Sequence, residues 1–159
     1  MNRSIRALLA GGAFSALLLV NTQASAAPPQ SALDVFKTEA FGQFTLCRLA
    51  AMVEVQKLLA SDFKDSEPTS IGQAQTTVSA CTKTAKKTIH PYFAGALKQL
   101  NKKKPAADAL KDYFVAWTVA LNNLPPLHND TEGGYYKRTG EEKRKFDDLW
   151  ERVILEASL

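Results

Sequence analysis

Apolar and small residues recur at intervals of three and four over residues 33–58, and this spacing constrains the fold more than any other feature. The positions are Leu33, Phe36, Ala40, Phe44, Cys47, Ala51, Val55 and Leu58. Such intervals place side chains on one face of an α-helix. Similar intervals return within 71–85, 92–100 and 146–157, and no segment alternates convincingly with period two. The sequence therefore predicts an all-α protein, a single-domain bundle of four to five helices.

Prolines and a capping pattern set the expected helix boundaries. Pro91 lacks an amide hydrogen and clashes with the preceding turn, so it predicts an end or a kink in the second helix. Pro105 suits a first helical turn, and Pro125-Pro126 ends that helix. Thr139-x-x-Glu142 matches a capping box at the start of the last helix, after a loop over 127–134. The expected helices are therefore 32–60, 68–90, 92–102, 105–124 and 140–157.

The first 26 residues have the three parts of a cleavable signal peptide. Arg3 and Arg6 give a positive start, residues 7–20 form an uncharged apolar run, and Ala24-Ser25-Ala26 matches the small-x-small cleavage pattern. The apolar run falls short of the about 20 residues that a membrane span needs, and no later stretch is long and apolar enough. An uncleaved anchor is the alternative.

We therefore expect a signal peptide over 1–26, cleaved near Ala26/Ala27, and a single helical domain over 27–159 with no transmembrane segment. The expected location is the periplasm or the medium. Loss of Arg3 and Arg6 leaves 18 basic against 16 acidic residues, so the mature chain is nearly neutral. We expect no nucleic-acid partner, because an exported protein of this charge lacks the electrostatic reason to bind one.

The two cysteines, Cys47 and Cys81, are expected to form a disulfide that ties the first two helices. Both lie on apolar stripes, 17 residues before and 17 after Lys64, which falls in the predicted turn. An antiparallel hairpin therefore brings them level, as a bridge with Cα atoms about 5.5 Å apart requires. An oxidising compartment favours pairing. The alternative is two buried free thiols.

No motif for catalysis, metal binding or cofactor binding is present, so we expect a non-enzymatic protein with no metal and no cofactor. His90 and His128 are the only histidines, too few to form a convergent metal site. Glu54 lies beside the first apolar stripe, where it is either a buried functional carboxylate or an edge residue that reaches water. Haem ligation through Met52 has no supporting spacing to either histidine.

Two stretches of sequence are candidate contacts with a partner. Tyr135, Tyr136, Lys137 and Arg138 follow Gly133-Gly134, and tyrosines and cations are enriched at binding hot spots. The alternative is that both tyrosines fold back onto the bundle. A lysine-rich region meets either an anionic partner or only solvent. Its residues are Lys83, Lys86, Lys87, Lys98, Lys102, Lys103 and Lys104.

The organisation of the chain resembles that of periplasmic immunity proteins, which neutralise toxins of rival bacteria, and equally that of acid-stress chaperones and orphan envelope proteins. No motif selects among these classes, so the analogy is one of class only. The leading hypothesis is an exported, non-enzymatic envelope protein that binds another protein. A second hypothesis is a small-ligand or haem carrier with a cavity lined by Met52, Trp117 and a histidine. The third is an enzyme with its cleft around Glu54.

Overall fold

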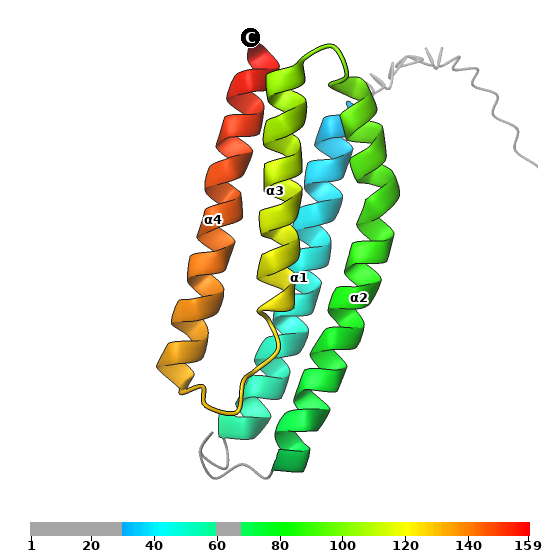
Figure 1. The fold of residues 1–159 in the computed structure, drawn as a ribbon. Helices are drawn as coiled ribbons and strands as arrows, with labels where there is room; N and C mark the ends of the chain where they lie inside the picture. Colours follow the sequence, from blue (N-terminus) through cyan, green and yellow to red (C-terminus); the bar gives the residue numbers. More distant parts are fainter. Residues whose placement is uncertain (1–29, 60–67) are drawn as a thin grey trace, which may run out of the picture.

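The computed structural model describes residues 30–59 and 68–159, and these residues form four helices that run alternately up and down (Figure 1). The helices are α1 (Ala32–Leu59), α2 (Pro68–Gln99), α3 (Lys104–Asn122) and α4 (Glu132–Ser158). The predicted all-α bundle is confirmed, and the described part holds no strand. The predicted signal peptide over 1–26 and the turn around Lys64 lie outside the described residues.

The bundle consists of two hairpins with different packing within and between them. The backbone of α1 lies close to that of α2, and that of α3 lies close to α4, whereas α1 and α4 hardly approach each other at backbone level. Buried alanines permit the close approach within the hairpins, and aromatic rings fill the space between them. The rings are those of Phe36, Phe44, Tyr113, Trp117, Phe146 and Trp150.

The core positions repeat every eleven residues in each helix, which explains why the helices run side by side for their whole length (Figure 1). Eleven residues over three turns correspond to about 3.67 residues per turn, near the natural period of the α-helix. The stripe of core residues therefore drifts slowly around each helix. Examples are Leu33, Phe44 and Val55 in α1, Ile71, Thr82 and Phe93 in α2, Ala106 and Trp117 in α3, and Tyr135, Phe146 and Ala157 in α4.

The predicted end of the second helix at Pro91 is wrong, because α2 continues through that proline to Gln99. The expected helix over 92–102 is thus the last part of α2. Proline in a helix interior costs about 3 kcal/mol or more. Here its ring lies on the exposed side, while Ile89 and Ala96 are fully buried on either side of it. Burial of such side chains stabilises by an amount comparable to the loss, so continuous packing outweighs the proline.

The last helix begins at Glu132, eight residues before the predicted start, so the expected loop over 127–134 is shorter than predicted. Thr131 is the N-cap, and its side-chain oxygen accepts a hydrogen bond from the amide of Gly134 at 3.1 Å. Thr139 is not a cap: it is buried, and its hydroxyl donates to the carbonyl of Tyr135. The sequence therefore contains two possible N-caps, Thr131 and Thr139. The cap at Thr131 lengthens the buried stripe of α4 by more than one turn.

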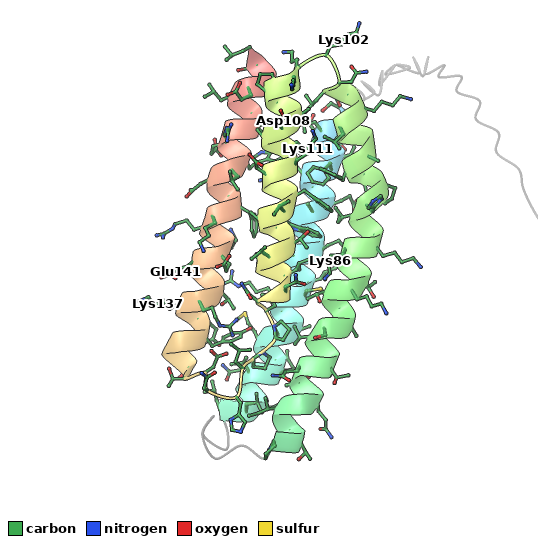
Figure 2. The ribbon with its side chains drawn as sticks, in the orientation of Figure 1. Lys86, Lys102, Asp108, Lys111, Lys137 and Glu141 are labelled. Atoms are coloured by element: carbon green, nitrogen blue, oxygen red, sulfur yellow. A yellow bond between two sulfur atoms is a disulfide. The ribbon has the colours of Figure 1, made fainter. Side chains whose placement is uncertain are left out.

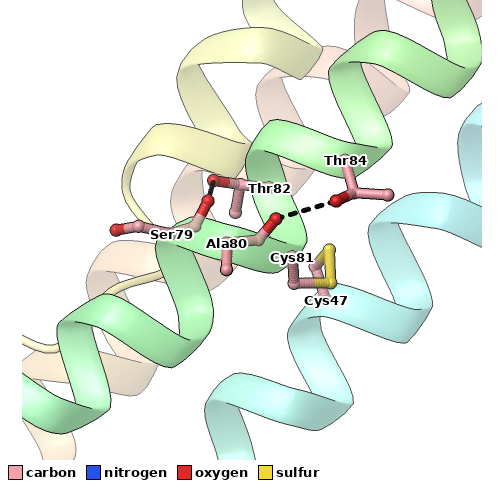
Figure 3. Close-up of a disulfide and its surroundings, with 6 residues drawn as sticks. All are labelled: Cys47, Ser79, Ala80, Cys81, Thr82 and Thr84. Atoms are coloured by element: carbon pink, nitrogen blue, oxygen red, sulfur yellow. Dashed lines mark hydrogen bonds between the residues drawn. A yellow bond between two sulfur atoms is a disulfide. The ribbon is translucent and has the colours of Figure 1, made fainter.

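The predicted disulfide is confirmed. Cys47 on α1 and Cys81 on α2 are bonded, with their Cα atoms 5.5 Å apart (Figure 3). Cys47 is fully buried, and the stripe on α2 passes through the neighbouring Thr82. The first hairpin is thus closed covalently near its middle, which fixes the register of α1 against α2.

Candidate binding surface

The predicted partner site at the start of α4 is divided between the core and the surface. Tyr135 is 1% exposed, and its hydroxyl donates to the carbonyl of Leu124 at 3.0 Å. Tyr136 is partly buried and accepts a long hydrogen bond from Gln56 of α1 at 3.5 Å. Lys137 is exposed on the outer side of α4 (Figure 2). The expected exposed patch around both tyrosines is therefore absent, because the early start of α4 places Tyr135 on the buried stripe.

Arg138, the fourth residue of that predicted site, holds the loop between α3 and α4. Its guanidinium donates to the carbonyl of Asn123 and forms a 2.5 Å ion pair with Asp130, which is 9% exposed. The same Asp130 carboxylate accepts the amide of Leu127 at 2.8 Å. A charge-assisted network of this kind orders the loop, so Arg138 has a structural task. Partner binding by these four residues stays a prediction.

The remaining sequence candidates do not meet in one place. His90 and His128 are exposed on α2 and on the α3–α4 loop, and residues 30–59 and 68–159 hold no cluster of three or more metal-ligating side chains. Trp117 is fully buried, with its indole N–H donating to the carbonyl of Ala40 at 3.0 Å, whereas Met52 lies at the surface of α1. The structure therefore gives no support to a haem pocket between Met52, Trp117 and a histidine.

Glu54 lies at the edge of the α1 stripe, as one of the two sequence interpretations expected. It forms an ion pair with Lys57 at 2.7 Å, and its side chain is 15% exposed. The pair joins neighbouring positions of one helix, where a salt bridge contributes a few tenths of a kcal/mol. Nothing in this arrangement indicates acid–base chemistry.

A buried tyrosine that the sequence analysis did not single out lies at the centre of the molecule. The ring of Tyr113 meets those of Phe36, Phe146 and Trp150 at centroid distances of 5.8, 5.9 and 5.1 Å. Its hydroxyl has no hydrogen-bond partner among the described residues, and burial raises the pKa of Tyr113 above its ordinary range. Lys37 covers the nearby Trp150 ring at 4.4 Å, and burial lowers the pKa of Lys37.

The lysine-rich region lies along α2 and its turn into α3. Residues 68–107 contain seven lysines and no acidic residue. Two of the lysines bind within the molecule: Lys86 donates to the side chain of Asn122 at 2.8 Å, and Lys103 donates to the carbonyl of Ala157 at 2.6 Å. Figure 2 shows Lys86 and Lys102 far apart along this side of the bundle. The lysines thus form a dispersed positive side rather than a concentrated site.

An apolar surface on α1 is the feature that the sequence analysis missed. We define the α1 outer face as Phe41, Leu46, Leu49, Met52 and Val53. Four of its members are at least half exposed: Phe41 by 50%, Leu46 by 59%, Leu49 by 53% and Val53 by 56%. Single exposed apolar residues are ordinary, but Leu49, Met52 and Val53 line one hollow together, and contiguous apolar surface is typical of a contact site.

The α1 outer face continues into a groove that runs between α1 and α4. The groove has a volume of about 340 Å³ and is lined by Phe41, Phe44, Thr45, Arg48, Leu49, Met52 and Lys143. A shallower hollow adjoins it along α1, where Leu49 and Met52 again line the wall. The groove exists because α4 keeps its backbone away from α1, and long side chains such as Phe44 and Phe146 bridge the gap beneath it.

One signal in the sequence pointed to this surface. Helix α1 has apolar residues outside its buried stripe, such as Leu46, Leu49 and Val53. Apolar residues on a second side of a helix are covered either by the rest of the bundle or by a further partner. The sequence does not distinguish between coverage by the bundle and coverage by a partner, because the position of α4 decides how much of α1 is covered.

Comparison with protein-family models, with curated proteins and with solved structures finds no match. None of the four helices is long and apolar enough to cross a bilayer. The surface chemistry of this chain is therefore the guide to its function.

Proposed function

We propose that this chain is an exported, non-enzymatic envelope protein that binds another protein, and that the α1 outer face is its contact surface. Toxin neutralisation and a chaperone-like activity are the two classes of function that this proposal covers. The disulfide between Cys47 and Cys81 supports export, because such bonds persist in oxidising compartments. The predicted signal peptide over 1–26 agrees with this compartment.

The exposed row of large apolar side chains on α1 carries the proposal. Phe41, Leu49 and Val53 are each about half exposed and follow one another along the helix. Covering the exposed half of a large apolar side chain stabilises by about 1 kcal/mol, so a partner gains several kcal/mol from the row. An uncovered row of this kind is also an aggregation liability, which gives a physical reason for a partner to cover it.

Site-specific photo-crosslinking in the native host tests the proposal. A benzoylphenylalanine at position 49 is expected to yield one covalent adduct of defined mass, whereas the same group at the exposed Thr77 of α2 is expected to yield none. Val53→Asp is expected to abolish the adduct, because it places a charge in the apolar contact. Val115→Asp is the matched control, since Val115 is 62% exposed on α3.

Two results would contradict the proposal. One is the absence of any adduct at position 49 in cells where the protein is folded and abundant. The other is an identical adduct at positions 49 and 77 that survives Val53→Asp, because such labelling reflects collision rather than a specific contact.

A further inference from the structure

The α1–α4 groove combines an apolar floor with a cation that is unpaired among the described residues. Arg48 lines the groove and has no hydrogen bond or ion pair within residues 30–59 and 68–159. Lys143 on the opposite wall is paired with Asp147 of its own helix. The five guanidinium N–H donors of Arg48 are therefore available, and they match the two oxygens of a carboxylate.

We propose that the groove receives an amphipathic helix of the partner protein, with an acidic side chain directed at Arg48. This inference rests on the proposed function and names the chemistry of the partner. The occupying helix lies along α1 and covers the edge that α4 leaves open. Its apolar stripe contacts Phe41, Leu49 and Met52, and its carboxylate contacts Arg48.

The walls of the groove explain why a helix fits better than an extended segment. Both walls are helices whose backbone N–H and C=O groups are already bonded within the helix. They therefore have no edge with which an extended strand could form backbone hydrogen bonds. A helix satisfies its own backbone and presents only side chains. The groove and the adjoining hollow together extend along α1 from Phe41 to Gln56, which is about 22 Å at 1.5 Å per residue and matches a partner helix of about 15 residues.

The place of Arg48 also argues against a second copy of this chain as the occupant. Arg48 lies at the middle of the surface that the groove and the adjoining hollow form together between Phe41 and Gln56. A two-fold axis through the centre of this surface therefore brings Arg48 of one copy against Arg48 of the other, whether the two α1 helices run parallel or antiparallel. Like charges that face each other in a desolvated contact oppose association.

Two designed peptides test the proposal with the protein purified from the exported fraction. Each is a stapled helix of about 15 residues with leucines on one face. One carries glutamates beside the leucines, and the other carries lysines at the same positions. Fluorescence anisotropy is expected to show that the acidic peptide binds at least about tenfold more tightly than the basic one. Arg48→Glu is expected to reverse this preference.

Further variants separate the groove from unspecific binding. Leu49→Asp is expected to weaken the acidic peptide by about thirtyfold, a typical loss at a hot spot, while Val115→Asp leaves it unchanged. Thermal melting verifies that each variant is folded. Leu49→Ala removes the apolar contact without adding a charge, and it is expected to weaken binding in the same direction if Leu49→Asp fails to fold.

Three outcomes overturn the inference. Equal affinity for both peptides removes the role of charge, and an unchanged preference in Arg48→Glu removes the role of that residue. Binding of laurate with no binding of either peptide assigns the groove to an acyl chain. In each case the crosslinking at position 49 tests the proposed function independently. If Val53→Asp abolishes the adduct at that position, the proposed function stands and only the acidic partner helix is rejected.

Discussion

Deleting one hydroxyl group from each of two buried tyrosines is expected to change stability in opposite directions. Tyr113 is fully buried, and its hydroxyl has no hydrogen-bond partner among the described residues. An unsatisfied buried polar group costs about 1–3 kcal/mol of desolvation free energy. Tyr113→Phe relieves this cost, and the ring contacts with Phe146 and Trp150 remain. We expect the free energy of unfolding to rise by about 1 kcal/mol.

Tyr135 provides the matched control, because it has the same burial and a different hydrogen-bonding state. Its hydroxyl donates to the carbonyl of Leu124 at 3.0 Å and so links α4 to the loop that follows α3. Tyr135→Phe removes this hydrogen bond and leaves the carbonyl of Leu124 without the tyrosine donor, which is expected to lower the free energy of unfolding by about 1–2 kcal/mol. The same atom deletion therefore gives a gain at one position and a loss at the other.

Urea denaturation of the oxidised protein, followed by circular dichroism, measures both changes. Equal slopes across wild type and the two variants show that the midpoints report stability. A change of 1 kcal/mol corresponds to roughly 3–5 °C in melting temperature for a chain of this size. A loss in Tyr113→Phe as large as that in Tyr135→Phe would falsify the reasoning, because it would mean that the Tyr113 hydroxyl is bonded in solution.

Alkaline unfolding gives an independent measure of the burial of Tyr135. Burial raises the pKa of Tyr135 from its ordinary value of 10 to about 12. Above pH 10 the unfolded chain loses this proton while the folded chain keeps it, so stability falls as the pH rises. The loss is about 1.4 kcal/mol per pH unit between pH 10 and 12 for this one group. Tyr135→Phe is expected to flatten that part of the profile, and an unchanged profile contradicts the assignment.

Three more predictions concern the loop, the disulfide and export. Arg138→Ala is expected to lower the free energy of unfolding by about 2–4 kcal/mol, because it leaves the buried Asp130 carboxylate without its cation. The control Lys137→Ala is expected to change it by no more than about 0.5 kcal/mol, and equal melting temperatures of the two variants would refute the prediction. Reduction of Cys47–Cys81 is expected to remove about 4 kcal/mol in the chain-entropy model, and two thiols that react freely in the folded, exported protein contradict the bond. Mass spectrometry is expected to find an N-terminus within two residues of Ala27, and an intact start in the envelope fraction refutes cleavage.

The disulfide and the first helix were predictable because their signals are local and periodic. Intervals of three and four place Leu33 and Leu58 on one face whatever the neighbouring helices do. Symmetry about the turn then places Cys47 level with Cys81. At the start of α1 the Ser31 hydroxyl accepts a hydrogen bond from the amide of Asp34 and donates one to the Asp34 carboxylate, so a local polar pair begins the helix.

The boundaries that failed depended on a comparison of energies that local patterns do not contain. Pro91 was expected to interrupt a helix, but burial on both sides of it outweighs the lost hydrogen bond. Thr139 and Thr131 both precede helical sequence with suitable polar residues. The choice between them depends on whether Tyr135 gains more from burial in the core than from exposure on a loop, and only the packed bundle provides that core.

The sequence by itself determined which face of each helix is apolar, and therefore that the chain folds as a bundle with α1 bonded to α2. The tertiary structure alone decided how the two hairpins are spaced. Aromatic rings between them hold α4 away from α1, and this separation leaves Leu49 exposed and Arg48 without a partner in the described residues. The spacing between helices depends on the summed volume of side chains from four segments, whereas helical periodicity depends on one segment at a time. The candidate binding surface therefore became visible only in three dimensions.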